Sequence, residues 1–214
     1  MIVLVLVVAL AMVPFIIWAT RSKGRRGVRW NGIDWNRGMS PAAKLVLEGV
    51  RLHDENRDEA AEGAFDRALA LEPSQVDALL GRALSRHRVK RLDDALADYD
   101  RAIAIAGPTS EALNNRGCLQ RDRGDLDRAI TDIEEALRLA TPGTTEHATA
   151  LVSLAEVLAQ RGEWDRALAS LQRAIAEDGT WREYARTSSV FAPLREARPT
   201  SEPFAPPVDA TAPE

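Results

Sequence analysis

The sequence of 214 residues contains a single cysteine, Cys118, and three separated histidines. One cysteine excludes an internal disulfide framework and a zinc site built from several cysteines. Aromatic residues make up only 5% of the chain, which is few for one large irregular core. The sequence also lacks the motifs of phosphate loops, dinucleotide-binding turns, serine nucleophiles and helical zinc sites. These absences predict a protein that is not an enzyme and that needs neither a cofactor nor a metal.

A net positive charge is found only in a short segment near the start. The net charge is −4, and the first 33 residues carry +5, so the remainder carries −9. A chain with this balance is not expected to bind nucleic acid. Because no motif of a substrate pocket is present either, we expect no nucleic-acid partner and no small-molecule substrate.

Residues 2–19 form a run without any charged side chain. As a helix the run would be about 27 Å long, close to the roughly 30 Å core of a bilayer. The basic residues that follow it are expected at the membrane surface: Arg21, Lys23, Arg25, Arg26 and Arg29. The apolar run predicts a single-pass transmembrane helix over residues 1–20 in the cell (inner) membrane. The positive-inside rule then predicts that the remainder of the chain is cytoplasmic. The alternative is a cleaved secretory signal, which normally has basic residues before its apolar run.

Residues 21–39 are expected to form a basic juxtamembrane segment and a short linker, because Gly and Asn punctuate the part after Trp30. Ser40 followed by Pro41 then has the pattern of a helix start, with a capping serine before a proline at the first helical position. We therefore expect the folded part of the chain to begin near residue 40.

From Ser40 onward the chain repeats itself with a period of roughly 34 residues. In each copy an alanine is followed four residues later by a larger apolar residue and three residues after that by another alanine. The fourth copy follows after a longer interval because of an insertion near residues 143–147. The four sets are Ala61, Phe65 and Ala68; Ala95, Tyr99 and Ala102; Ala129, Ile133 and Ala136; and Ala167, Leu171 and Ala174. Small residues let two helices approach closely and large ones fill the groove beside them, so the spacing predicts stacked helical pairs.

Further residues recur in phase with this pattern. Small residues stand in the first helix of each pair, and residues typical of turns separate the two helices. The small residues are Gly49, Ala83, Gly117 and Ala155, and the turns are marked by Asn56, Lys90, Gly124 and Gly162. These features resemble the tetratricopeptide repeat family, most clearly over residues 111–142.

The resemblance implies an all-α fold, a right-handed superhelical stack of about four helical hairpins behind the transmembrane helix. The hairpins are expected at residues 42–75, 76–109, 110–143 and 148–181. Residues 182–197 are expected to form a capping helix that covers the last apolar face. Residues 198–214 contain five prolines and are expected to be a disordered tail.

In this family the stacked first helices present a concave groove, which implies a site for a partner protein or peptide. The residues expected there are Val46, Val50, His53, Leu80, Leu84, His87, Asn114 and Arg121. His53 and His87 are one repeat apart and hold equivalent positions, so we expect groove polarity from them rather than metal binding. Some members of the family grip a C-terminal carboxylate with a clamp that begins with Lys and Asn. Val46 and Val50 stand at those positions, which argues against that ligand.

Together these observations predict a membrane-tethered scaffold for protein–protein interaction, which contacts the lipid bilayer through residues 2–19. Two alternatives remain open at this point. The chain could be an exported envelope assembly factor with the repeats on the outer side, or it could be a regulatory subunit of a membrane complex.

Overall fold

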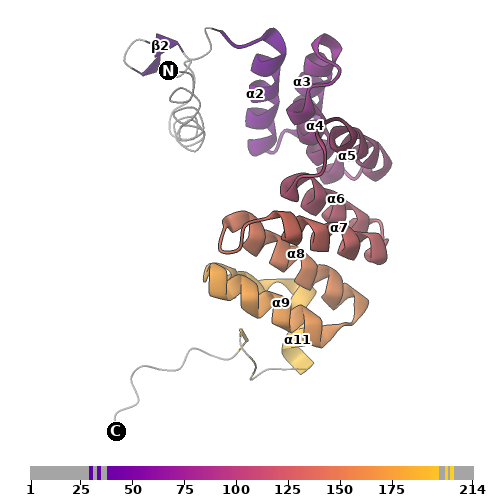
Figure 1. The fold of residues 1–214 in the computed structure, drawn as a ribbon, viewed down its shortest axis with the longest axis vertical. Helices are drawn as coiled ribbons and strands as arrows, with labels where there is room; N and C mark the ends of the chain where they lie inside the picture. The colour runs from indigo at the N-terminus through magenta and orange to yellow at the C-terminus, as the bar shows by residue number, and fades with distance from the viewer. Residues whose placement is uncertain (1–28, 31–32, 35–37, 198–200, 202, 205–214) are drawn as a thin grey trace.

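The computed structural model describes residues 29–30, 33–34, 38–197, 201 and 203–204. Within these ranges, eight helices of 13 to 17 residues form four antiparallel pairs that stack along the long axis of the molecule (Figure 1). We refer to the pairs as repeats 1 to 4. They are α2 (Pro41–Asp54) with α3 (Asp58–Leu71), α4 (Val76–Arg88) with α5 (Leu92–Ala106), α6 (Ser110–Asp122) with α7 (Leu126–Leu139), and α8 (Thr145–Arg161) with α9 (Trp164–Glu177). The predicted stack of helical hairpins is confirmed.

Polar caps fix where the first helices begin. Ser40 Oγ accepts a hydrogen bond from the N–H of Ala43 at 3.1 Å, and Thr109 Oγ1 accepts one from Ala112 at 3.2 Å. Thr144 caps α8 in the same way through His147. The inserted residues therefore lengthen α8, which begins at Thr145, three residues before the expected start of the fourth hairpin.

The turn inside each repeat needs one residue with a left-handed backbone. Asn56 and Lys90 have φ angles of 57° and 65°, and Gly124 and Gly162 have φ angles of 83° and 84°. Glycine adopts this conformation without strain, and asparagine does so more readily than most other residues. These are the four positions at which the sequence indicated a turn.

The alanine–apolar–alanine pattern forms the core of every repeat. All twelve of its residues are at most 1% exposed. In repeat 1 the ring of Phe65 lies between two glycines of neighbouring first helices. A methyl group placed on Gly49 or Gly81 would lie only 2.6 or 2.4 Å from a ring carbon of Phe65. Glycine at these positions lets α2 and α4 pack closely around the ring.

Most of the buried apolar side chains of the described residues fall into three groups. One joins α2, α3 and α4, and the largest joins α7, α8, α9 and the C-terminal helices. Between them, at the junction of repeats 2 and 3, Ala83, Ala95, Tyr99 and Leu119 make up a small third group. The hydroxyl of Tyr99 is buried there without a hydrogen-bond partner. Apolar packing is therefore thinnest at the middle of the stack.

Charged side chains cross this same junction. Arg116 of α6 pairs with Asp100 of α5 at 2.8 Å, and Lys90 pairs with Asp122 of α6 at 2.9 Å. The second and third repeats are thus linked by polar contacts as well as by the small apolar group.

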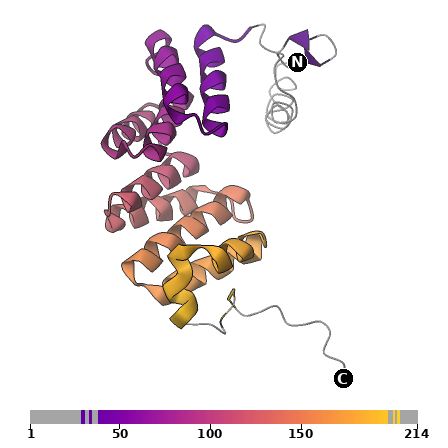
Figure 2. The ribbon, with the colours of Figure 1, turned by 180° about the vertical axis from the view of Figure 1, so that it is seen from behind.

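The C-terminal segment differs in detail from the predicted capping helix over 182–197. It forms α10 (Trp181–Thr187), a short 3-10 helix η1 (Ser189–Phe191) and α11 (Ala192–Ala197), and these lie beside the last repeat (Figure 2). The helix is interrupted because Ser188 has an extended backbone, with ψ at 131°. Phe191 is buried against repeat 4, as a cap requires.

Part of the expected disordered tail is also packed. Pro203 and Phe204 are buried, and Phe204 joins the apolar group of α7, α8 and α9. The high proline content predicted disorder for residues 198–214 as a whole, but burial of the aromatic ring stabilises the packed position of Phe204. For these two residues the prediction is wrong.

The linker expected before residue 40 contains a small antiparallel ladder. Strand β1 (Arg29–Trp30) pairs with β2 (Ile33–Asp34), and Arg29 lies opposite Asp34. The intervening sequence, Asn-Gly, is a pair favoured at hairpin turns, and the linker interpretation overlooked it.

The predicted transmembrane helix over residues 1–20 lies outside the described residues. The same holds for the basic residues Arg21, Lys23, Arg25 and Arg26, while the backbone of Arg29 belongs to β1. Among the helices that the structure does describe, none is both long and apolar enough to cross a membrane.

Candidate partner-binding groove

The eight residues predicted to line the groove lie on the first helices α2, α4 and α6, at positions that recur from one repeat to the next. Val50 is the most open, at 43% exposed. Half-buried side chains follow on α4 and α6: Leu80, Leu84, His87, Asn114 and Arg121. The side-chain oxygen of Asn114 is buried without a hydrogen-bond partner. These six residues leave a mixed apolar and polar surface on the three helices.

The other two predicted residues are buried. Val46 is 8% exposed and packs in the apolar group of repeats 1 and 2. His53 Nδ1 lies 2.6 Å from Asp58 Oδ1, and Arg88 donates to His53 Nε2 at 2.8 Å. The ring therefore carries its proton on Nδ1 and joins α2, α3 and α4. Val46 and His53 support the first repeat and offer little surface to a partner.

Polar pairs connect each first helix to the next, and in the first two pairs the partner stands one position beyond the equivalent residue. His53 pairs with Arg88, His87 Nε2 lies 3.1 Å from Asp122 Oδ2, and Arg121 donates to Glu156. His53 and His87 hold equivalent positions but each bonds to the following repeat rather than to the other. We call this row of pairs the inter-repeat ladder.

Asp122 sits at the centre of the ladder. Burial opposes its ionisation, but hydrogen bonds from Lys90, His87 and Arg121 outweigh burial and lower the pKa of Asp122 to about 2. Burial also lowers the pKa of His87 below its ordinary value of 6.5, although Asp122 acts in the opposite direction. The ladder thus favours a neutral His87 beside a charged carboxylate.

We expect His87 to make the fold less stable as the pH falls from about 7 to about 5. Because its pKa is lowered by folding, the unfolded chain binds the proton more readily, and protonation favours unfolding below roughly pH 6.5. A His87→Gln variant keeps a donor for Asp122 and should show a smaller loss of stability over this range. Urea unfolding at both pH values measures the difference. An NMR titration in which His87 titrates above pH 6.5 would contradict the explanation.

The inner face of the fourth repeat is not open. From His147 to Ala159 nearly every residue of α8 is buried, including Val152 and Glu156. Tyr184 of α10 donates to Glu156 and packs edge-on against Phe191. The C-terminal helices therefore cover α8, and the open surface is restricted to α2, α4 and α6.

The structure also reveals arginine forks that the sequence interpretation missed. Arg82 donates to both oxygens of Asp98, at 2.8 and 2.6 Å, and to Asp66 of the preceding repeat at 2.6 Å. Arg116 repeats this arrangement with Asp132 and Asp100, one repeat further along the chain. The signal was present in the sequence, since the Arg and the Asp of each fork stand at the same interval in both repeats. Each fork ties a first helix to the second helices on both sides.

Solved structures of other proteins share this fold. TTC0263, a thermophilic TPR protein in Thermus thermophilus, is 24% identical with a TM-score of 0.60, and the match covers 73% of this chain and 82% of that one. PilW, described as a widely conserved type IV pilus biogenesis factor, is 19% identical with a TM-score of 0.65, covering 75% and 71%. YrrB, described as a TPR protein with an unusual peptide-binding site, is 17% identical with a TM-score of 0.55, covering 76% and 87%. At these identities the similarity establishes the fold alone.

No curated protein matches the chain significantly. The sequence model of the tetratricopeptide repeat matches residues 50–111 and 114–180, which together are more than half of the chain. The matched ranges extend from α2 to α9, through all four of the repeats described above. The chain therefore belongs to the tetratricopeptide repeat family.

Proposed function

We propose that this protein is a membrane-tethered scaffold without catalytic activity, which docks a partner protein or peptide on the open faces of α2, α4 and α6. One observation supports this most directly. Val50 and Leu84 leave apolar surface uncovered on the first helices, while the equivalent face of α8 is covered by the protein's own C-terminal helices. The first helices of three repeats therefore keep an open face on which a segment of another protein could bind.

The open surface has two parts with different chemistry. Val50, Leu80 and Leu84 make the part on repeats 1 and 2 apolar, whereas Asn114 and Arg121 make the part on repeat 3 polar. An amphipathic helix or an extended segment with apolar anchors at one end and hydrogen-bonding groups at the other would match both parts. YrrB, which has the same fold, is described as having a peptide-binding site.

Membrane attachment through residues 2–19 would hold the repeats close to the bilayer. A partner in the same membrane would then meet the groove at a raised effective concentration, without any additional contact. The basic residues from Arg21 to Arg29 would strengthen this attachment by binding anionic lipid headgroups.

The groove is tested by a Val50→Arg, Leu84→Arg double variant. Affinity capture of the full chain from detergent-solubilised membranes should recover fewer specific partners with this variant, because two charges replace the apolar anchor. A Leu71→Arg, Ile105→Arg double variant is the matched control, since both are exposed apolar residues at equivalent positions of neighbouring second helices. Circular dichroism must show that both variants fold. Equal recovery with all three proteins would rule out the groove as the docking surface.

The side of the membrane on which the repeats lie distinguishes this proposal from the alternative, an exported envelope assembly factor. PilW, of the same fold, is described as a pilus biogenesis factor. A reporter that is active only outside the cytoplasm, fused to the C-terminus, should be inactive if the repeats are cytoplasmic. An active reporter would favour the exported form. Extraction of the chain from membranes by carbonate would contradict the anchor in either orientation.

A further inference from the structure

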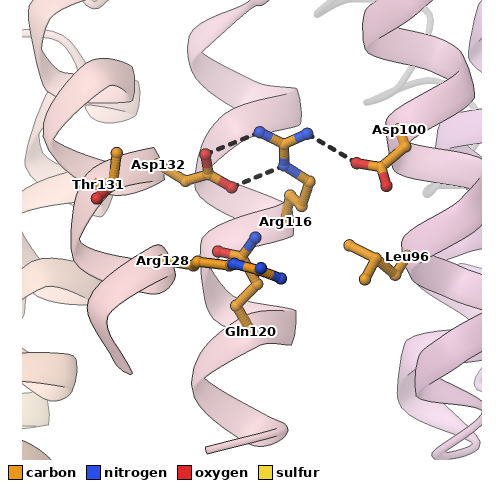
Figure 3. Close-up of a pocket in the computed structure, with 7 residues that line it drawn as sticks. All are labelled: Leu96, Asp100, Arg116, Gln120, Arg128, Thr131 and Asp132. Atoms are coloured by element: carbon orange, nitrogen blue, oxygen red, sulfur yellow. Dashed lines mark hydrogen bonds and ion pairs between the residues drawn. The ribbon is translucent and has the colours of Figure 1, made fainter. Parts of the chain in front are cut away.

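A cavity of about 320 Å³ lies between α5, α6 and α7, and none of the predicted groove residues lines it. Figure 3 shows Leu96 and Asp100 facing it from one side and Asp132 and Arg128 from the other, with Arg116 and Gln120 of α6 between them. The volume is on the order of ten times the ~30 Å³ share of a water molecule in the liquid. There is room for a planar polar group and the stem that carries it.

The equivalent place one repeat earlier is filled by an arginine. There Arg86 donates to Glu62 Oε1 at 2.8 Å and to Asp98 Oδ2 at 2.6 Å. A shift by one repeat replaces Arg86 by Gln120 and Glu62 by Leu96, but it retains the acid as Asp132. The third repeat has therefore kept a carboxylate that binds guanidinium in repeat 2 while losing the guanidinium.

The side-chain oxygen of Gln120 lacks a hydrogen-bond donor. Its side chain is almost fully enclosed, with the residue 7% exposed, and its Oε1 is buried without a hydrogen-bond partner. An unpaired buried acceptor is unfavourable, and such a group in a native structure calls for an explanation. An N–H group placed in the cavity that Gln120 lines would satisfy it.

The carboxylates of the cavity keep acceptor sites for a further donor. Two arginines and two aspartates line it, and Arg116 donates to both Asp132 and Asp100. Arg128 stands at the rim, largely exposed, and pairs with Asp125 at 3.4 Å. Each carboxylate oxygen has two acceptor sites, so both carboxylates can accept further hydrogen bonds.

We propose that this cavity binds a guanidinium group, carried either by an arginine side chain of a partner protein or by a small guanidine compound. The group would donate to Asp132 and to Gln120 Oε1, in the place that Arg86 occupies in repeat 2. An ammonium group, which lacks the planar fork, would match the two acceptors less well. The site is separate from the groove, so it stands or falls independently of the proposed function.

The test uses the full chain in detergent micelles and three probes, followed by NMR and calorimetry. N-acetyl-arginine amide should bind saturably, whereas the lysine analogue and the uncharged citrulline analogue should bind about tenfold more weakly or not at all. A Gln120→Arg variant should abolish binding and raise the melting temperature, because it fills the cavity from within. Gln160→Arg, at an exposed position of α8, is the matched control and should bind the probe as the wild type does.

A second variant and a second comparison complete the design. Gln120→Met keeps the size but removes the acceptor, and it should weaken binding even if Gln120→Arg does not fold. Agmatine binding as tightly as a blocked Gly-Arg-Gly peptide would identify a small guanidine as sufficient, and much tighter peptide binding would identify a protein source. No saturable binding of any guanidine probe, or binding unchanged by both Gln120 variants, would overturn the proposal.

Discussion

Replacing Asp98 by alanine should lower the free energy of unfolding by about 3 kcal/mol or more. Asp98 is almost fully buried and accepts hydrogen bonds from Arg82 and Arg86 at 2.6 to 2.8 Å. Without the carboxylate, two largely buried guanidinium groups would each lose one of their two carboxylate partners, because Arg82 keeps only Asp66 and Arg86 keeps only Glu62. Breaking a buried network of charged hydrogen bonds is among the more destabilising changes in a protein interior. Urea unfolding followed by circular dichroism measures the loss.

The matched control lies on the same helix. Asp94 is exposed and pairs with Arg91 at 2.7 Å, so Asp94→Ala should leave the stability almost unchanged. Asp98→Asn should fall between the two alanine variants, because the amide keeps one acceptor oxygen but loses the charge. Equal small effects of Asp98→Ala and Asp94→Ala would show that the fork is dispensable.

The second large effect on the free energy of unfolding is expected at the ring of Phe65, which lies between Gly49 and Gly81. In the wild type, Gly81→Ala should destabilise the protein by about 1–3 kcal/mol, because its methyl group would lie 2.4 Å from Phe65 Cζ. Phe65→Ala alone should cost about 3–5 kcal/mol through the cavity it leaves. In that background, however, Gly81→Ala no longer meets the ring and should stabilise the helix by up to about 1 kcal/mol. The same substitution is thus expected to change sign, and a double-mutant cycle measures the coupling.

Gly63→Ala serves as the control for this cycle. Gly63 lies in α3, and a methyl group there would meet nothing within 4 Å. It should therefore be mildly stabilising in both backgrounds, by up to about 1 kcal/mol. If Gly81→Ala destabilised the Phe65→Ala variant as much as the wild type, the close contact would not be the cause.

The core of the stack could be predicted from the sequence because it depends on local period and size. Ala61, Phe65 and Ala68 and their counterparts repeat in phase, and a helical pair can bury such a stripe only against another pair. The turns were equally predictable, since Gly124 and Gly162 mark positions where the backbone must be left-handed. Each of these signals belongs to one repeat and needs no knowledge of its neighbours.

Features that depend on two repeats at once were harder to anticipate. The pairing of His87 with Asp122 depends on how two first helices lie side by side. Asp122 stands one position beyond the equivalent of His87 in the next repeat, so the repeat period does not indicate it as the partner. The covering of α8 depends on where α10 docks, which a short helix with an interrupted pattern does not indicate. The burial of Phe204 likewise depends on an apolar group whose other members come from earlier parts of the chain, from α7 onward.

The thin apolar group between repeats 2 and 3 has a mechanical consequence. In a linear array each repeat contacts only its neighbours, so the array bends most easily at its weakest inter-repeat interface. Here that interface relies on ion pairs such as Arg116–Asp100 and Lys90–Asp122, whose outer partners are exposed and whose strength declines with added salt. As the ionic strength rises, the two halves of the stack would then bend more freely at the interface of α5 and α6. A ligand that binds both halves at once would restrict this bending.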